Sequence, residues 1–569
     1  MRIAIVGSGV SGLGATWLLK EYSGHEVNIY EKGDYPGGHT HTVKFGRLGK
    51  KSCDVDTGFI VLNPVTYPNF LRFLRHINIP LLETEMTFSV SRNRGEFEWA
   101  GEGLGGLFCQ ITNLFNPRLY RMVFDVLRFN VFAKDLLRAE ETIGKMSIGE
   151  YLEREGYGDG FKEDYLLVRA HPPAVYLPYP RSPVPPDSRG LAVYGPMTAA
   201  IWSTAADQAA LDFPALTLIR FFHNHHLLQL TGKPKWLTVQ GGAKKYVDAI
   251  LSKVPKENLH LNTEITAVRS LPNGVELTEA GGAKHIYDHV ILATHSDTTL
   301  AMLRAGGEAT MQEEKALGSW SWSKNEAVLH WDERLMPTRR RAYSAWNYLT
   351  STSASSAASK EGAKSTSPSS SVDTRRRVAD IYFARCSTYD MNILQHLPES
   401  KHGPVLVTLN PPFPPDPHKT LGRWTYTHPM MTAESVSSQP LLPSIQNKRH
   451  ISYAGAWTKY GFHEDGFTSA MRLVTAPPFS VKPPFPVLPA HRAVEKTDMV
   501  EEMLRAVLGA MQMVLMNAEP VWQWVVVLAV VVLGLVGNLA EALRLEPVVN
   551  EVERLRVCWE GNEESRKRR

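Results

Sequence analysis

The sequence predicts an α/β protein that begins with a Rossmann-like dinucleotide-binding unit. Residues 2–6 form a short apolar run typical of a β-strand, and a glycine-rich turn follows at once. Apolar residues then recur at helical spacing through Lys20, and a second strand, 27–30, ends on Glu31. Strand, glycine turn, helix, strand and acidic residue in this order define the first βαβ unit of the fold.

The glycine turn has the GxGxxG spacing that binds a nucleotide pyrophosphate. Its first glycine permits a tight turn, the second lets the backbone approach the phosphates, and the third lets the helix lie close to the sheet. The helix N-terminus then offers unpaired N–H groups to the phosphates, and the acidic residue accepts a hydrogen bond from a ribose hydroxyl. The expected contacts in this unit are Gly7, Gly9, Val10, Ser11, Gly12, Glu31 and Lys32.

Length and composition limit the other possibilities. At 569 residues, with 43% apolar and 21% charged residues, the chain is an ordinary globular protein with more than one packed unit. A net charge of +4, with no basic stripe, predicts no nucleic-acid partner. Four cysteines far apart, with no CxxC pair, argue against a disulfide framework and a zinc site, so no metal is expected.

Residues further along resemble the flavin amine oxidase superfamily. Gly37-Gly38-His39 follows the acidic residue in the manner typical of these flavoproteins, and Asp56-Thr57-Gly58-Phe59 resembles the segment that they place beside the flavin ring. Near the end, Tyr453 to Trp457 and Gly461 to Gly466 resemble the returning C-terminal flavin motif. A nicotinamide enzyme has no need of such a distant return, so the resemblance implies FAD rather than NAD.

The resemblance covers roughly residues 1–475. It is strongest for the NAD/FAD-binding branch related to protoporphyrinogen oxidase and carotenoid desaturases, which is associated with fatty-acid modification. Many members carry an acidic residue where this chain has Ala456, so either Asp465 or backbone N–H groups are expected to make that contact. The resemblance adds these cofactor contacts: Gly37, Gly38, His39, Gly58, Phe59, Ile265, Gly455, Ala456, Asp465, Gly466 and Phe467.

The resemblance implies an FAD-binding domain with an interleaved α+β substrate domain. Residues 168–195 hold seven prolines in 28 residues and are expected to lie outside the fold, as a retained intron, a gene-model error or a surface loop. Residues 351–371, with ten serines, are expected to form a surface loop. The expected parts are FAD-binding segments at 1–62, 238–300 and 446–476, a substrate domain at 63–237 and 301–445, a proline-rich linker at 477–499, a membrane segment at 500–540 and a charged tail at 541–569.

The membrane prediction rests on Pro520 to Ala540, 21 residues without a charge. A helix of that length spans roughly 30 Å, one hydrocarbon core, so a C-terminal transmembrane helix is expected and a buried core helix is the alternative. No secretory signal is visible, so the flavin domain is expected in the cytosol, anchored to a membrane, with the endoplasmic reticulum favoured. A plain tail anchor is preferred over a hairpin in which Val500 to Met516 lies in the membrane interface.

The resemblance implies an FAD-dependent oxidoreductase that moves a hydride from a C–H bond of a hydrophobic, lipid-like or amine substrate to the flavin. A flavin-dependent lipid isomerase and a membrane-tethered flavin-binding protein without turnover are the alternatives. No catalytic residue is assigned. Candidates for direct chemistry, each with a structural alternative, are His39, His41, His463, Glu464 and Asp465. The run Arg339 to Arg341 is a candidate to receive a substrate carboxylate, and a solvated loop is the alternative.

Overall fold

The computed structural model describes residues 1–138, 146–168, 193–194, 214–229, 234–307, 309–350, 386–489 and 499–517. The predicted transmembrane helix, Pro520 to Ala540, the serine-rich loop and the charged tail lie outside these residues. So does the proline-rich stretch, except its ends, where β9 (Leu167–Val168) pairs with β10 (Val193–Tyr194). Among the helices that are described, none is long and apolar enough to cross a membrane.

A five-stranded parallel sheet carries the predicted nucleotide-binding unit, with the order β12-β2-β1-β16-β22. Helix α1 (Val10–Tyr22) follows β1 as predicted and packs against α19 (His463–Thr475). The predicted strand, helix and strand are thereby confirmed, with boundaries within two residues. The strands are β1 (Arg2–Val6), β2 (Glu26–Tyr30), β12 (Leu259–His260), β16 (His289–Leu292) and β22 (Ile451–Tyr453).

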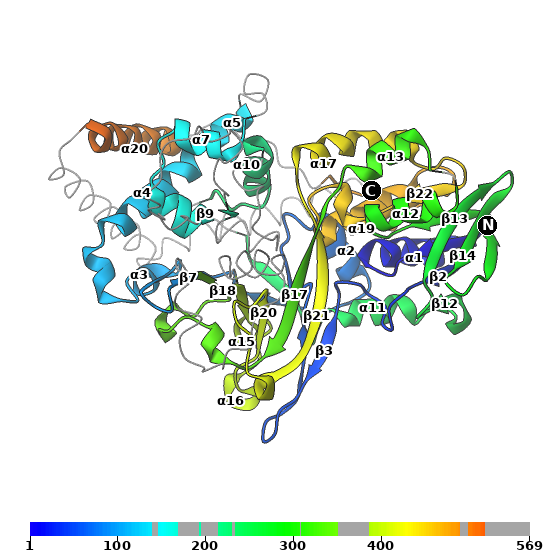
Figure 1. Ribbon diagram of the computed structural model, residues 1–569, viewed down its shortest axis with the longest axis horizontal. Coiled ribbons are helices and arrows are strands. Elements are labelled where there is room, and N and C mark those ends of the chain that lie inside the picture. Colours follow the sequence, from blue (N-terminus) through cyan, green and yellow to red (C-terminus); the bar gives the residue numbers. More distant parts are fainter. Residues whose placement is uncertain are drawn as a thin grey trace, which may run out of the picture.

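Smaller elements surround this sheet. They include three helices on the same half of the molecule, α11 (Lys244–Leu251), α12 (Ser296–Ala305) and α13 (Met311–Gly318), seen on the right in Figure 1. Helix α2 (Pro68–His76) packs on α19. The small sheets are β3 (Thr42–Phe45) with β4 (Cys53–Asp56); β5 (Val61–Leu62), β11 (Trp236–Val239) and β6 (Leu81–Thr84); and β13 (Ile265–Leu271), β14 (Gly274–Glu279) and β15 (Lys284–Tyr287).

A seven-stranded mixed sheet forms the second layer, in the order β21-β17-β20-β19-β18-β7-β8. Its long strands β17 and β21 run through the middle of the molecule in Figure 1. Residues 81–100, in the predicted α+β substrate domain, supply β6, β7 and β8. The strands are β7 (Phe88–Arg92), β8 (Phe97–Ala100), β17 (Trp322–His330), β18 (Trp346–Thr350), β19 (Cys386–Asp390), β20 (Leu406–Leu409) and β21 (Thr420–Pro429).

Helices gather on the other half of the molecule and form a cap (Figure 1, left). Local signals explain their starts: Asn116 caps α4 by accepting from the N–H of Arg118, and Ser147 and Glu150 form a capping box on α7. The cap helices are α3 (Gly103–Leu107), α4 (Pro117–Phe132), α5 (Lys134–Arg138), α7 (Ile148–Arg154), α8 (Asp159–Phe161), α10 (Ala215–Asn224) and α20 (Met499–Asn517).

Residues 477–489, expected to form a linker, lie against the nucleotide-binding half instead. Phe479 and Val481 are buried there, and the ring of Phe485 stacks on Trp17 with a centroid distance of 5.9 Å. Prolines prevent a helix or a central strand, but an extended chain can still place its aromatic side chains in a core. This stretch therefore belongs to the globular part.

Helix α20 coincides with part of the segment, 500–540, that was expected in the membrane. Its inner face, which includes Leu504, Leu508 and Leu515, packs on Phe124 and Val131 of α4. Residues 500–517 are therefore part of the cap, because their leucines repeat at helical spacing and find an apolar partner within the chain.

Candidate active site

The N-terminus of α1 forms an open cradle at the glycine turn. Gly9 is its N-cap, no side chain caps it, and the first helical hydrogen bond runs from the N–H of Leu13 to the carbonyl of Gly9, 2.9 Å. A Cβ on Gly12 would lie 1.9 Å from the carbonyl oxygen of Gly7, so only glycine fits there. A Cβ on Gly9 would meet no heavy atom within 4 Å, which leaves room for a pyrophosphate over the helix N-terminus.

Glu31, predicted to bind a ribose hydroxyl, also has a structural role in the glycine turn. Its Oε2 accepts the backbone N–H of Ser8 at 3.0 Å and the Ser8 hydroxyl at 2.6 Å, and its Oε1 accepts the N–H of Gly33 at 2.9 Å. The carboxylate thus orders the glycine turn as well as lying near the cradle. Lys32, by contrast, is exposed.

Two distant motifs meet at this cradle. A Cβ on Gly38 would lie 3.2 Å from Cα of Gly9, and a Cβ on Gly466 would lie 2.7 Å from Val10 and 2.8 Å from Ser11. The double glycine and the C-terminal motif therefore both touch the first turn of α1. Bulkier residues at either position would push the motifs off the helix.

Three of the segments that resemble flavin-binding motifs converge beyond the cradle. The N–H of Phe59 donates to the carbonyl of His39 at 2.9 Å, and the Phe59 ring stacks on His463 with a centroid distance of 3.8 Å. His463 Nε2 lies 2.8 Å from the hydroxyl of Thr40. His41 lies beside this cluster: its ring stacks on Tyr35, and its Nδ1 lies 3.2 Å from the Thr57 hydroxyl and 3.1 Å from the Tyr426 hydroxyl.

Four other predicted cofactor contacts lie outside this cluster. Phe467 lies in the hydrophobic core, where its ring packs near Trp17. The ring is so close to Gly14 that a Cβ on that glycine would lie 2.9 Å from it. Ile265 is 5% exposed at the start of β13. Gly455 donates its N–H to the Ser469 hydroxyl at 3.0 Å, and Ala456 lies beside Gly466.

The two acids at the start of α19 are occupied by the protein itself. Glu464 accepts the backbone N–H groups of Asn69 and Phe70 at 3.1 and 2.9 Å, which ties α19 to α2. Asp465 accepts two backbone N–H groups of the loop 460–462 at 3.2 and 3.1 Å. Burial raises the pKa of Glu464 to about 7 and that of Asp465 to about 6. Both therefore act as structural groups in this arrangement.

A cavity of about 180 Å³ opens where the cradle, the seven-stranded sheet and the cap meet. Its walls come from segments far apart in the chain and are mainly aromatic and apolar. None of the described residues in its walls is an Asp, Glu, Lys or Arg. The lining residues are His39, Gly58, Phe59, Ile60, Val61, Tyr67, Met86, Phe221, His225, Leu227, Trp236, Trp346, Tyr389, Tyr426, His428, Gly461, Phe462 and His463.

The histidines of this wall are neutral at ordinary pH. Burial lowers the pKa of His39 and His225 to about 4, and burial together with the nearby His39 lowers that of His428 to about 3. Burial also holds the pKa of His463 well below its usual value. The cavity therefore offers polar imidazole nitrogens without a net charge.

A family model described as flavin containing amine oxidoreductase matches residues 10–476, most of the chain. The chain belongs to this family. No curated protein sequence matches it significantly.

Two solved structures share the fold of this chain. The CLA-producing fatty acid isomerase from P. acnes is 13% identical, with 83% of this chain and 98% of that chain covered and a TM-score of 0.52. The cyclohexylamine oxidase from Brevibacterium oxydans is 12% identical, with 83% and 98% covered and a TM-score of 0.50. At these identities the likeness shows the fold alone.

As a flavin-containing amine oxidoreductase, the chain is an FAD-dependent enzyme. The residues present fit this cofactor: the uncapped N-terminus of α1, the free space over Gly9 and the carboxylate of Glu31 can hold its nucleotide part. His39 and Phe59, where the cradle leads into the cavity, can border its flavin ring. Bound FAD supplies the two-electron acceptor.

Several cavity residues of this oxidoreductase were not singled out from the sequence. His225 lies just after α10, Trp346 on β18, Tyr389 on β19, and Tyr426 and His428 on β21. The strands alternate their side chains between two faces, but no local pattern tells which face borders a cavity. Only the packing of the cap onto the sheet brings these residues together.

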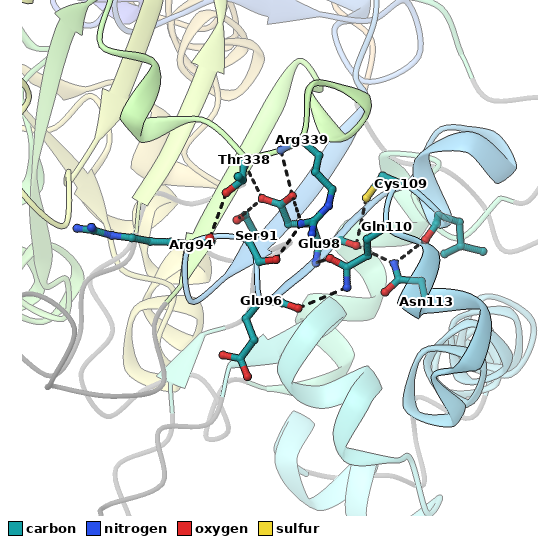
Figure 2. A network of polar contacts seen from close by, with 11 residues as sticks. Ser91, Arg94, Glu96, Glu98, Cys109, Gln110, Asn113, Thr338 and Arg339 are labelled. Atoms are coloured by element: carbon teal, nitrogen blue, oxygen red, sulfur yellow. Dashed lines mark hydrogen bonds and ion pairs between the residues drawn. The ribbon is translucent and has the colours of Figure 1, made fainter.

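Arg339 and Arg340, from the run considered as a binding site for a substrate carboxylate, have structural roles. Glu98, fully buried on β8, accepts the N–H of Thr338 at 2.6 Å, the Ser91 hydroxyl at 2.7 Å and the Nη1–H of Arg339 at 2.9 Å. Figure 2 shows Arg339 reaching back to this carboxylate. Arg340 pairs with two surface glutamates. Arg339 therefore holds the edge of the seven-stranded sheet and does not line the cavity.

Proposed function

We propose that this oxidoreductase acts on an uncharged, lipid-like substrate and oxidises one of its C–H bonds. The observation that carries the proposal is the cavity wall, which has neutral histidines and no charged side chain among the described residues. A cationic amine would enter without a carboxylate partner, and desolvating an unpaired charge costs several kcal/mol. An apolar chain, by contrast, gains from contact with such a wall.

The chain's own residues have clear parts in this reaction. Phe221 and Phe462 stack with a centroid distance of 5.3 Å and close the wall between the cap and the C-terminal motif, which excludes water. The neutral imidazole rings of His39 and His428 have a centroid distance of 5.1 Å. Either ring can orient a polar group of the substrate by a hydrogen bond. Orientation and a dry wall are what a protein contributes to flavin chemistry.

The proposal predicts a selective effect of charge in the wall. Leu227 lines the cavity from the cap side, just beyond α10, so Leu227→Glu should leave FAD content unchanged. It should raise KM for the lipid substrate at least roughly tenfold, because a buried carboxylate opposes an apolar ligand. Leu227→Met, which keeps volume and polarity, is the matched control.

The assay is anaerobic bleaching of the flavin band by a fractionated lipid extract. A fraction that bleaches the wild type and Leu227→Met, but not Leu227→Glu at the same concentration, supports the proposal. Bleaching by a cationic amine that equals or exceeds that by every lipid fraction contradicts it. A lipid product of unchanged mass would indicate isomerisation instead.

We further propose that the enzyme associates with a membrane through the uncharged stretch 520–540, with its flavin domain in the cytosol and the endoplasmic reticulum as the favoured organelle. The support is sequence: 21 residues without a charge match one hydrocarbon core. Fractionation of cells tests this, since recovery of the chain entirely in the soluble fraction would contradict it.

A further inference from the structure

Three large apolar side chains are exposed together at one end of the cap. Ile111, Leu114 and Phe115 have exposed fractions of 75%, 43% and 74% and all lie on the 3₁₀ helix η1 (Ile111–Phe115). We call these three residues the apolar tip. η1 leads directly into α4, which begins at Pro117. Clustered side chains of this kind, when they remain exposed, mark a surface for a partner or a membrane.

Helix α20 brings the chain back to the same end of the cap. Near its start, Glu501 forms an ion pair with Lys134, which lies just after the end of α4. Further along, the Oε1 of Gln512 accepts a hydrogen bond from Nη2 of Arg121, near the start of α4, at 3.3 Å. The two helices are therefore antiparallel. α20 ends five residues beyond Gln512 and α4 begins four residues before Arg121. At 1.5 Å per residue these are about 7.5 and 6 Å, so the end of α20 lies level with the start of α4, which directly follows the apolar tip.

The sequence that follows α20 is apolar. Residues 520–540 carry no charge, and they begin three residues after Asn517. On α20 itself, Met513 is 64% exposed, one residue beyond Gln512. Helix α20, which leads into the uncharged stretch, thus ends at the same end of the cap as the start of α4, next to the apolar tip.

We infer that the apolar tip docks onto the surface of a lipid bilayer. The inference rests on the proposed membrane association and adds to it that the cap itself contacts the lipid. Apolar side chains that enter the headgroup boundary bind a membrane in proportion to the area they bury. The cap also carries Phe221 and His225, which line the cavity, so the unit that docks is the unit that forms part of the cavity wall.

The test uses the full-length chain with unilamellar phosphatidylcholine vesicles. Ile111→Asn with Phe115→Asn should leave FAD content and thermal stability unchanged, because both side chains are about three-quarters exposed. Each substitution should weaken vesicle binding roughly tenfold. Ile286→Asn with Met311→Asn is the matched control, since these apolar residues are 55% and 89% exposed on the other half of the molecule. Vesicle affinity of this control should equal that of the wild type.

Methionine oxidation gives a second measurement on the wild type. Vesicles should slow peroxide oxidation of Met513 at least roughly tenfold by burial, while Met311 reacts as before. If the tip variant binds vesicles as tightly as the wild type and Met513 stays reactive, the apolar tip does not dock. If Met513 is equally protected without vesicles, the chain's own apolar stretch or a second copy covers this end, and the inference is wrong. If the wild type does not bind vesicles at all, the membrane association itself fails.

Discussion

Gly9→Val tests the cofactor cradle most directly. Gly9 has φ −65° and ψ −179°, an extended conformation that valine adopts without strain, and a Cβ there meets no heavy atom within 4 Å. The variant should therefore fold. Its two methyl groups, however, project into the free space over the N-terminus of α1, where the pyrophosphate of FAD lies in this fold.

The expected loss follows from the contacts that the methyl groups displace. A hydrogen bond to a charged group contributes about 1.5–3 kcal/mol. Removing two N–H contacts from the pyrophosphate should weaken binding by about 3–6 kcal/mol, which corresponds to a rise in Kd of roughly a hundredfold to ten-thousandfold.

The assay is a titration of apoprotein with FAD, together with the ratio of flavin to protein after gel filtration. Gly24→Val is the matched control, because a Cβ on Gly24 also meets no atom within 4 Å but lies in the exposed turn between α1 and β2. It should bind FAD as the wild type does. Equal flavin occupancy in Gly9→Val and the wild type would refute the assignment of the cradle.

Three further predictions follow from single contacts. Glu31→Ala should raise the Kd of FAD at least roughly tenfold in the same titration, since one charge-assisted hydrogen bond to the ribose is lost together with the hydrogen bonds from Ser8 and Gly33 that order the glycine turn; an unchanged Kd would contradict this. Arg339→Ala should lower the free energy of unfolding in urea by about 1–3 kcal/mol with an unchanged flavin spectrum, because Glu98 stays buried without its cation; a change in KM alone would favour a substrate contact instead. The free energy of unfolding of the wild type should fall as the pH drops below about 6.5. The pKa of His428 is about 3 in the folded protein, so the unfolded chain takes up the proton at a higher pH than the folded chain does. Between pH 7 and 5 the part of this loss that is due to His428 is about 2 kcal/mol, and the loss should be smaller by that amount in His428→Gln; equal pH profiles would show that His428 is not held neutral.

The sequence by itself determined the elements whose signal is local. The glycine spacing and the strands around it predicted β1, α1 and β2, because tight turns, close helix packing and the period of apolar residues depend only on neighbours along the chain. The segment from Tyr67 to His76, whose apolar residues recur at helical spacing, likewise coincides with α2, Pro68–His76. Motif resemblance also identified the FAD family, since backbone contacts to a phosphate demand glycine at fixed positions.

The tertiary structure alone decided what the distant segments do. Asp465 looked available for the cofactor, but its carboxylate closes the loop before α19, and Arg339 lies against Glu98 rather than a substrate. The proline content of 477–489 indicated a linker, yet its aromatic side chains enter the core. The uncharged cavity arises where β18, β19 and β21 meet α10. Periodicity shows which face of an element is apolar, but which partner covers that face is settled by packing between segments hundreds of residues apart.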